Sequence, residues 1–279
     1  MKYYLICSFL FATYFVSAQS TSLEFADSLL KNKNYFEASV WYERCIYEGT
    51  SDKLIKDAVS GKLKCLKASK LYDKALEFAI LSSTLNIDET FKTELIYQQI
   101  LCSYLSAKFE NTIALSNQFE EQFTDKKTGL KIKLLKILSY NELNRWNEAD
   151  IIYTQINIQN SYSGIVEKLY KEVPIFKSEK KAKTLSTFLP GSGIIYAGKP
   201  WEGILNIALE LGSAGFIVKA FINRYYFSSW LIGGGLATSF YFGGERRSEA
   251  LVKKYNLKKS ITYNEKLKAA LVKSFSIEE

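Results

Sequence analysis

The feature that most constrains the fold of this chain is an internal repeat of 37 residues. Four aromatic residues recur at this interval: Tyr35, Tyr72, Phe109 and Trp146. A small residue follows each of them three positions later: Ala38, Ala75, Thr112 and Ala149. A further series lies seven positions after each aromatic residue: Tyr42, Ala79, Ser116 and Tyr153. Self-similarity at a fixed period of this size is typical of stacked repeat architectures.

The spacing within each repeat predicts a helix–turn–helix unit. Each aromatic residue opens the second helix, the small residue one turn later lets a neighbouring helix approach, and the next position fills the space between units. The preceding helix supplies a matching apolar series: Ala26, Leu63, Ile100 and Ile137. Cys65 and Cys102 share one position of this helix, where a small packing residue is expected. The sequence therefore predicts an all-α fold with four degenerate repeats.

Two segments of the repeat region resemble the tetratricopeptide repeat family. Residues 34–45 read Asn-Tyr-Phe-Glu-Ala-Ser-Val-Trp-Tyr-Glu-Arg-Cys, and residues 145–153 read Arg-Trp-Asn-Glu-Ala-Asp-Ile-Ile-Tyr. The family repeat is about 34 residues long, so the additional residues are expected in the turns. The resemblance covers residues 21 to 160 and implies a solenoid that binds a protein or peptide. A spacer or a self-association surface is the alternative.

The N-terminus is predicted to be a signal peptide over residues 1–18. Lys2 precedes an apolar run without charge from Tyr4 to Val16, and Val16-Ser17-Ala18 offers small residues at the cleavage site. An uncleaved anchor is the alternative, although the run is short for a membrane span. Export places the repeat domain, residues 19–176, in the periplasm of a bacterial cell envelope.

The chain contains no histidine, which excludes Ser-His-Asp and Cys-His catalysis and every histidine-ligated metal site. The three cysteines beyond the signal peptide are an odd number at wide spacing, which favours neither a disulfide framework nor a zinc site. We predict no catalytic residue, no cofactor and no metal, and hence a protein that is not an enzyme.

Two long apolar stretches follow in residues 177–244. Gly203 to Ile222 and Tyr225 to Gly244 each reach about 30 Å as helices, the thickness of the hydrocarbon core of a bilayer. Only Asn223 and Arg224 separate them, so the sequence predicts an antiparallel membrane hairpin. A buried helix pair in a soluble domain is the alternative.

Small and aromatic residues in these stretches fit a membrane hairpin. Small residues spaced four apart are expected to pack the two helices together: Ala208 with Gly212, Gly234 with Thr238, and Gly235 with Ser239. Aromatic side chains near the ends of the stretches are expected at the lipid interface: Trp201, Tyr225, Tyr226 and Tyr241.

A motif precedes the first stretch and is formed by Pro190, Gly191, Gly193, Tyr196, Gly198 and Lys199. It resembles the Pro-Gly-x-Gly-Gln-x-Tyr-x-Gly-Lys motif of bacterial envelope proteins of unknown function, with Ile194 in place of Gln. The resemblance implies membrane attachment and no known activity. The same residues spell Gly-x-x-x-x-Gly-Lys, but Pro200 replaces the hydroxyl residue that a phosphate-binding loop needs. We therefore predict that the chain binds no nucleotide.

Charge is concentrated in the C-terminal part of the chain. From residue 177 onward there are 16 Lys and Arg against 8 Asp and Glu. The excess flanks the apolar stretches and continues into a basic helical tail over residues 245–279, which favours membrane lipid over nucleic acid. With the repeats exported, these basic flanks lie on the side that the positive-inside rule disfavours.

Together these patterns predict an envelope scaffold anchored in a membrane. Its repeats would bind a protein or peptide partner. The alternative is a transport or membrane-insertion accessory in which the hairpin is the working part. In that case Glu210, a carboxylate in the middle of an apolar stretch, would matter.

Overall fold

The computed structural model describes residues 22–49, 51–85, 88–122, 126–160 and 164–275. The predicted signal peptide lies outside these residues. All regular elements in the described part of the chain are helices. The chain divides into two compact units, Met1–Ser161 and Tyr162–Glu279. The expected boundary was later, at residue 176.

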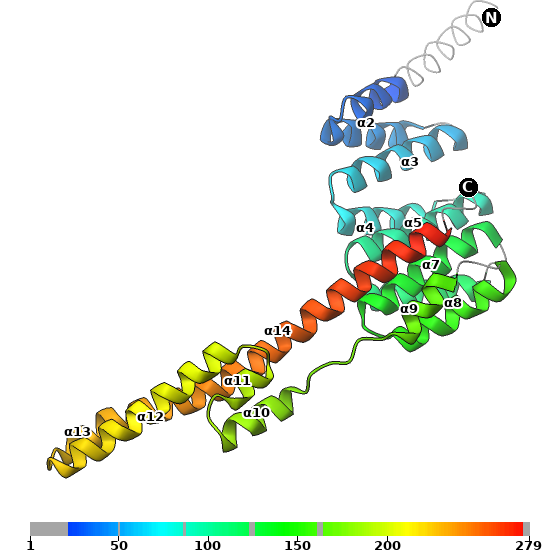
Figure 1. The fold of residues 1–279 in the computed structure, drawn as a ribbon. Helices are drawn as coiled ribbons and strands as arrows, with labels where there is room; N and C mark the ends of the chain where they lie inside the picture. The colour runs from blue at the N-terminus through cyan, green and yellow to red at the C-terminus, as the bar shows by residue number, and fades with distance from the viewer. Residues whose placement is uncertain (1–21, 50, 86–87, 123–125, 161–163, 276–279) are drawn as a thin grey trace, which may run out of the picture. The chain divides into compact units, whose positions relative to one another are not determined.

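Unit 1 is a series of helices in which each packs on its neighbours in the sequence (Figure 1). After a helix at residues 22–31 come α2 (Tyr35–Glu48), α3 (Asp52–Ala68), α4 (Tyr72–Ser82), α5 (Glu89–Leu105), α6 (Phe109–Gln122), α7 (Lys126–Glu142) and α8 (Trp146–Asn160). The side chains of Ser51 and Asp88 accept hydrogen bonds from backbone N–H groups in the first turns of α3 and α5, which satisfies donors that a helix start leaves free.

The turns between paired helices in unit 1 recur at the same 37-residue interval. Lys33, Lys70, Ala107 and Asn144 all have positive φ, between 57° and 61°. In each turn the following amide bonds back to a carbonyl five residues earlier, as Leu71 N does to Leu66 O at 2.9 Å. This is the Schellman arrangement, which closes a helix by satisfying its last carbonyl groups. Four copies of one turn give successive helix pairs the same local geometry.

The periodic residues of unit 1 form its core. The small residues Ala38, Ala75, Thr112 and Ala149 are fully buried, as are Tyr42, Ala79, Ser116 and Tyr153. Trp146 is 7% exposed, whereas Tyr35, Tyr72 and Phe109 are half-buried. Tyr42 lies over Gly61 of α3, where an added Cβ would come within 2.3 Å of the ring.

A polar contact also follows the repeat. Lys108 Nζ lies 2.7 Å from Asp73 Oδ1, and 37 positions later Arg145 lies 3.6 Å from Glu110. In each pair the acid follows one periodic aromatic residue and the base precedes the next. The first pair of units has Phe36 and Leu71 at these positions, and both side chains are exposed.

Unit 2 is built on one long helix, which α9, α10, α11 and α12 contact (Figure 1). Its elements are α9 (Gly164–Lys171), α10 (Glu179–Phe188), α11 (Ser192–Tyr196), α12 (Pro200–Ile222), α13 (Tyr226–Ser228), a π-helical turn η1 (Ser229–Gly233) and α14 (Gly234–Phe275). The Tyr263 hydroxyl donates to Leu169 O at 2.8 Å. This contact between α14 and α9 explains why the unit begins before residue 177.

The basic tail expected from Glu245 is not a separate segment. α14 has 42 residues and runs without a break through residue 245, about 63 Å at the rise of an α-helix. No glycine or proline lies between Glu245 and Phe275, so nothing in the sequence ends the helix there. Residues 234–244, the second half of the apolar stretch, and the basic stretch therefore belong to one helix.

Candidate functional site

The candidate site is the surface of α12 and the segment that follows it. Among the described residues, α12 is the one helix that is long and apolar enough to cross a membrane. Only 11% of its most apolar 18-residue window is buried. A core helix of a soluble protein has the same composition but is covered by its neighbours. Most of the apolar surface of α12 is not covered in this way.

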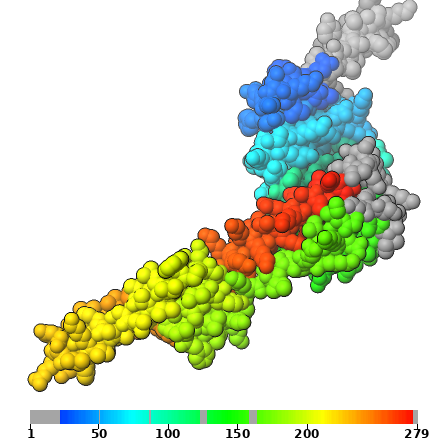
Figure 2. All heavy atoms as spheres, in the orientation of Figure 1, coloured from blue at the N-terminus to red at the C-terminus, as the bar shows by residue number. Residues whose placement is uncertain are grey.

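Large apolar side chains are exposed on α12 and on the segment that follows it. On α12 the exposed ones include Trp201, Ile204, Leu205, Leu211, Val218, Phe221 and Ile222, and after the turn Tyr225, Tyr226, Phe227, Trp230, Leu231, Ile232, Leu236 and Phe242. Figure 2 shows the yellow end of unit 2, which α12 and α13 form, without cover from other segments of the unit in that view. An exposed apolar surface of this extent is typical of proteins that contact a membrane or a partner.

The turn at the end of α12 repeats the geometry of the turns in unit 1. Arg224 has φ 61°, and the Tyr225 amide bonds to Ala220 O at 2.9 Å. The following segment then turns back and packs on α12. This segment contains the π-helical turn Ser229–Gly233, and the Ser229 hydroxyl donates to Ile217 O at 2.9 Å.

The residues that bring the two helices together are not the predicted ones. An added Cβ at Gly212, Gly234 or Gly235 would meet nothing within 4 Å. The hydroxyls of Thr238 and Ser239 bond to carbonyls of their own helix. The predicted pairs were therefore wrong, because a spacing of four selects one face of a helix without indicating which face meets the neighbour.

The close approach occurs instead at Gly233 and Gly244. A Cβ at Gly233 would lie 2.5 Å from Ile217 Cγ1, and one at Gly244 would lie 2.4 Å from Asn206 Oδ1. The Asn206 amide donates to Phe240 O at 3.2 Å, which links α12 to α14. Asn206 was not predicted, although an amide in an apolar stretch is a recognisable signal for an interhelical hydrogen bond.

Glu210 lies one turn beyond Asn206 on α12. It is partly buried, and its Oε1 atom has no hydrogen-bond partner among the described residues. Lys219, the other charge in the helix interior, is exposed. No described group of histidine, cysteine, aspartate or glutamate residues could hold a metal ion.

The glycines of the Pro-Gly motif mark places where backbones meet. Gly191 has φ 80°, and a Cβ there would lie 2.3 Å from Gly203 O. At Gly193 it would lie 2.1 Å from Ala182 O. Ile194, which stands where the resembling motif has Gln, is 2% exposed and packs in a cluster with Leu251 and Val252. The motif thus packs α11 against α10, α12 and α14.

Tyr196 and Lys199 of the motif lie at the polar edge of this junction. The Tyr196 hydroxyl accepts from Ser178 N at 3.2 Å, and its carbonyl accepts from Lys177 Nζ at 2.9 Å. Lys177 Nζ also lies 4.3 Å from the ring centre of Tyr255. Gly198 has φ 99° and is exposed, as Lys199 is, whereas Pro190 is partly buried.

The Gly-x-x-x-x-Gly-Lys string is not arranged as a phosphate-binding loop. Residues 192–196 are helical, and the amides of Ala197, Gly198 and Lys199 bond to carbonyls within the same turn. A phosphate loop directs such amides towards its ligand. Here they are already engaged within the chain.

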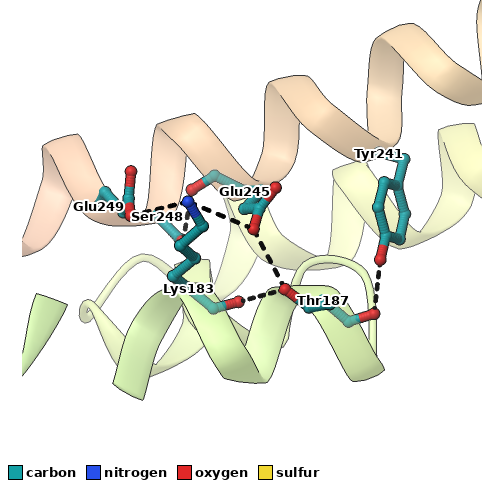
Figure 3. A network of polar contacts seen from close by, with 6 residues as sticks. All are labelled: Lys183, Thr187, Tyr241, Glu245, Ser248 and Glu249. Carbon is teal, nitrogen blue, oxygen red and sulfur yellow. Dashed lines mark hydrogen bonds and ion pairs between the residues drawn. The ribbon is translucent and has the colours of Figure 1, made fainter. Parts of the chain in front are cut away.

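A polar clamp joins α10 to α14 (Figure 3). The Tyr241 hydroxyl donates to Thr187 O at 2.8 Å. The Thr187 hydroxyl is within donating distance of two acceptors, Glu245 Oε1 at 3.2 Å and Lys183 O of its own helix at 3.1 Å. Lys183 Nζ lies 3.8 Å from Glu245 and 3.6 Å from Glu249. Tyr241, which the sequence analysis expected at a lipid interface, bonds to α10 through its hydroxyl.

Comparison with known proteins identifies no relative: no family model, no curated protein and no solved structure matches the chain.

Proposed function

We propose that the chain is a non-enzymatic scaffold of a bacterial cell envelope. Four tetratricopeptide-like repeats would form a solenoid in the periplasm and bind a protein or peptide partner. A helical hairpin formed by α12 and the segment from Tyr226 to Gly244 would anchor it in a membrane. The observation that carries the proposal is the exposed apolar surface of α12.

The dimensions of the hairpin support a span of the whole hydrocarbon core. The 23 residues of α12 reach about 35 Å, slightly more than the core of a bilayer. Arg224 lies at the turn between the helices, and an arginine at the bilayer centre is costly. A full span lets Arg224 reach water on the far side, and a half-inserted hairpin does not.

An apolar stripe on α2 supports a partner surface in the repeats. Phe36, Val40 and Tyr47 are 79%, 54% and 92% exposed, and their spacing places them near one side of the helix. Phe36 and Leu71 also stand where later repeats carry ion pairs. Exposed apolar side chains that cluster in this way are typical of an interaction surface.

Membrane fractionation with protease protection tests the anchor. The full-length chain should require detergent for release, whereas a chain that ends at Ser161 should be soluble. Protease added from the periplasmic side should cleave the repeats. Release of the full-length chain by salt alone would contradict the anchor.

Crosslinking in intact cells tests the scaffold. A photoreactive residue at Phe36 should capture one protein reproducibly, and the same residue at Phe78, which is partly buried in a core cluster, should not. Equal labelling of many proteins from both positions would contradict a specific partner surface.

The second candidate, a transport or insertion accessory, is favoured by one observation, the unpartnered Oε1 atom of Glu210. The substitution Glu210→Gln distinguishes the two functions, because it removes the ionisable group and keeps the shape. A scaffold should retain its cellular function with Gln at this position. A proton- or ion-coupled accessory should lose it.

A further inference from the structure

Cations surround the end of the hairpin where α10, α11, α12 and α14 meet. The residues 177–183, 199–202 and 245–254 carry nine Lys and Arg and four Glu. We call the nine cations the basic collar: Lys177, Lys180, Lys181, Lys183, Lys199, Arg246, Arg247, Lys253 and Lys254. The packing of α10 on α14 and of α11 on α12 brings these segments together.

Every carboxylate in these three segments is already in an ion pair. Glu202 lies 2.8 Å from Arg247, Glu179 lies 3.6 Å from Lys253, and Glu245 and Glu249 share Lys183. Lys180, Arg246 and Lys254 are exposed and have no carboxylate within ion-pair distance among the described residues. The collar therefore has positive charge that the chain itself does not neutralise.

Apolar side chains lie beside these cations. Phe188 at the end of α10 and Trp201 at the start of α12 are 85% and 81% exposed, and Leu189 is also exposed. α10 thus carries lysines in its first two turns and ends in an exposed Phe-Leu pair. This combination is typical of a segment that lies at a membrane surface, and an exposed tryptophan favours the same depth.

We propose that the basic collar binds the phosphate groups of anionic phospholipids around the hairpin. The proposal rests on the membrane anchor and adds the class of lipid that the anchor selects. Each phosphate would accept hydrogen bonds from Lys180, Arg246 or Lys254, while its acyl chains lie along α12. A phosphate bound to cations far from the apolar helices would lack this second contact, the one between acyl chains and α12.

The test uses the full-length chain in phosphatidylcholine vesicles that contain a trace of spin-labelled lipid. Spin-labelled phosphatidylglycerol should be immobilised at the protein in preference to spin-labelled phosphatidylcholine, by roughly threefold or more at low salt. The preference should fall as salt is added, because the charges lie at the surface. Equal immobilisation of the two lipids would overturn the proposal.

A matched pair of variants separates the collar from the general charge of the chain. The combined change Lys180→Gln, Arg246→Gln and Lys254→Gln should reduce the preference to near one. The control Lys266→Gln, Lys268→Gln and Lys273→Gln removes the same charge from the distal part of α14 and should keep the preference. An equal loss in both variants would assign the effect to net charge and overturn the collar.

Two further outcomes separate lipid binding from the binding of a free anion and from a failed anchor. Inorganic phosphate at constant ionic strength should leave the preference unchanged, since a free ion lacks the acyl chains. If it abolishes the preference, the site binds free phosphate and the lipid proposal is wrong. If the chain does not float with the phosphatidylcholine vesicles, the membrane anchor itself fails.

Discussion

At the scale of single residues, the glycines show where the chain is tightly packed. A Cβ at Gly61 would overlap the buried ring of Tyr42, whose hydroxyl donates to Asp27 at 2.5 Å. A Cβ at Gly129 would meet nothing within 4 Å. Both glycines lie in helices of unit 1. Only Gly61 is required for packing, because only its Cβ position is occupied by another side chain.

Gly61→Ala should therefore lower the free energy of unfolding by about 1–3 kcal/mol, because the ring and the backbone have to move. Gly129→Ala should leave stability unchanged or raise it by up to about 1 kcal/mol, since alanine favours a helix. Unfolding of unit 1 in urea, monitored by hydrogen exchange, measures both changes in the free energy of unfolding. Equal effects of the two substitutions would show that the Tyr42 contact is unimportant.

Burial in the apolar cluster around Val59 and Leu95 raises the pKa of the Cys102 thiol from 9.0 to about 11. Between these two values the unfolded chain loses a proton that the folded chain keeps, so stability should fall as pH rises through this window. Cys102 should account for about 2 kcal/mol of the loss by pH 10.5.

Comparison with Cys102→Ala isolates this effect from other groups that titrate in the same range. The decrease in unfolding free energy between pH 8 and pH 10.5 should be smaller in the variant, because alanine has no proton to lose. Identical pH dependence in the two proteins would contradict the prediction.

At the scale of elements, the clamp between α10 and α14 is a local feature that can be removed without disturbing the apolar packing. The Thr187 hydroxyl and the Tyr241 hydroxyl both bond between the helices. The Thr238 hydroxyl bonds only to carbonyls of its own helix. Thr238 is thus a matched control on the same apolar segment.

Thr187→Val and Tyr241→Phe should each weaken the docking of α10 by about 0.5–1.5 kcal/mol, the usual contribution of one hydrogen bond. Hydrogen exchange of the amides in residues 182–189 should accelerate accordingly in both variants. Thr238→Val should leave these amides unchanged. Acceleration in the control as well would mean that the clamp does not hold α10.

At the scale of the whole molecule, the chain is two units that each have a core of their own. Core clusters of unit 1 lie between its helix pairs, and a separate cluster in unit 2 contains Ile194, Leu251 and Val252. A change that loosens one core should therefore act within its own unit.

Gly61→Ala and Gly193→Ala test this independence in the full-length chain in detergent. The first should accelerate hydrogen exchange in residues 22–160 and not in 164–275. The second should do the reverse, because its Cβ would overlap Ala182 O. Acceleration throughout the chain from either substitution would indicate a single cooperative unit.

The all-helical class and the starts of four helices in unit 1 follow from the sequence by itself. Periodic apolar residues and the small number of prolines, three in the whole chain, decide them through interactions that reach only one or two turns. The starts of α2, α4, α6 and α8 at Tyr35, Tyr72, Phe109 and Trp146 coincide with the predicted aromatic positions. The turn from α12 into the next helix was likewise predicted at Asn223 and Arg224.

Other features were decided only by tertiary structure. Gly233 of η1 and Gly244 of α14, not the predicted small pairs, lie closest to α12, because the face that a helix presents depends on its partner. The continuation of α14 through Glu245 is different, because it is a local property that the sequence analysis missed: helix propensity does not respond to a change from apolar to basic residues. The pairing of each collar carboxylate with a lysine or arginine on another element depends on distances between segments far apart in the sequence. The composition gives only the number of these charges, and the fold determines which cations have no carboxylate as a partner.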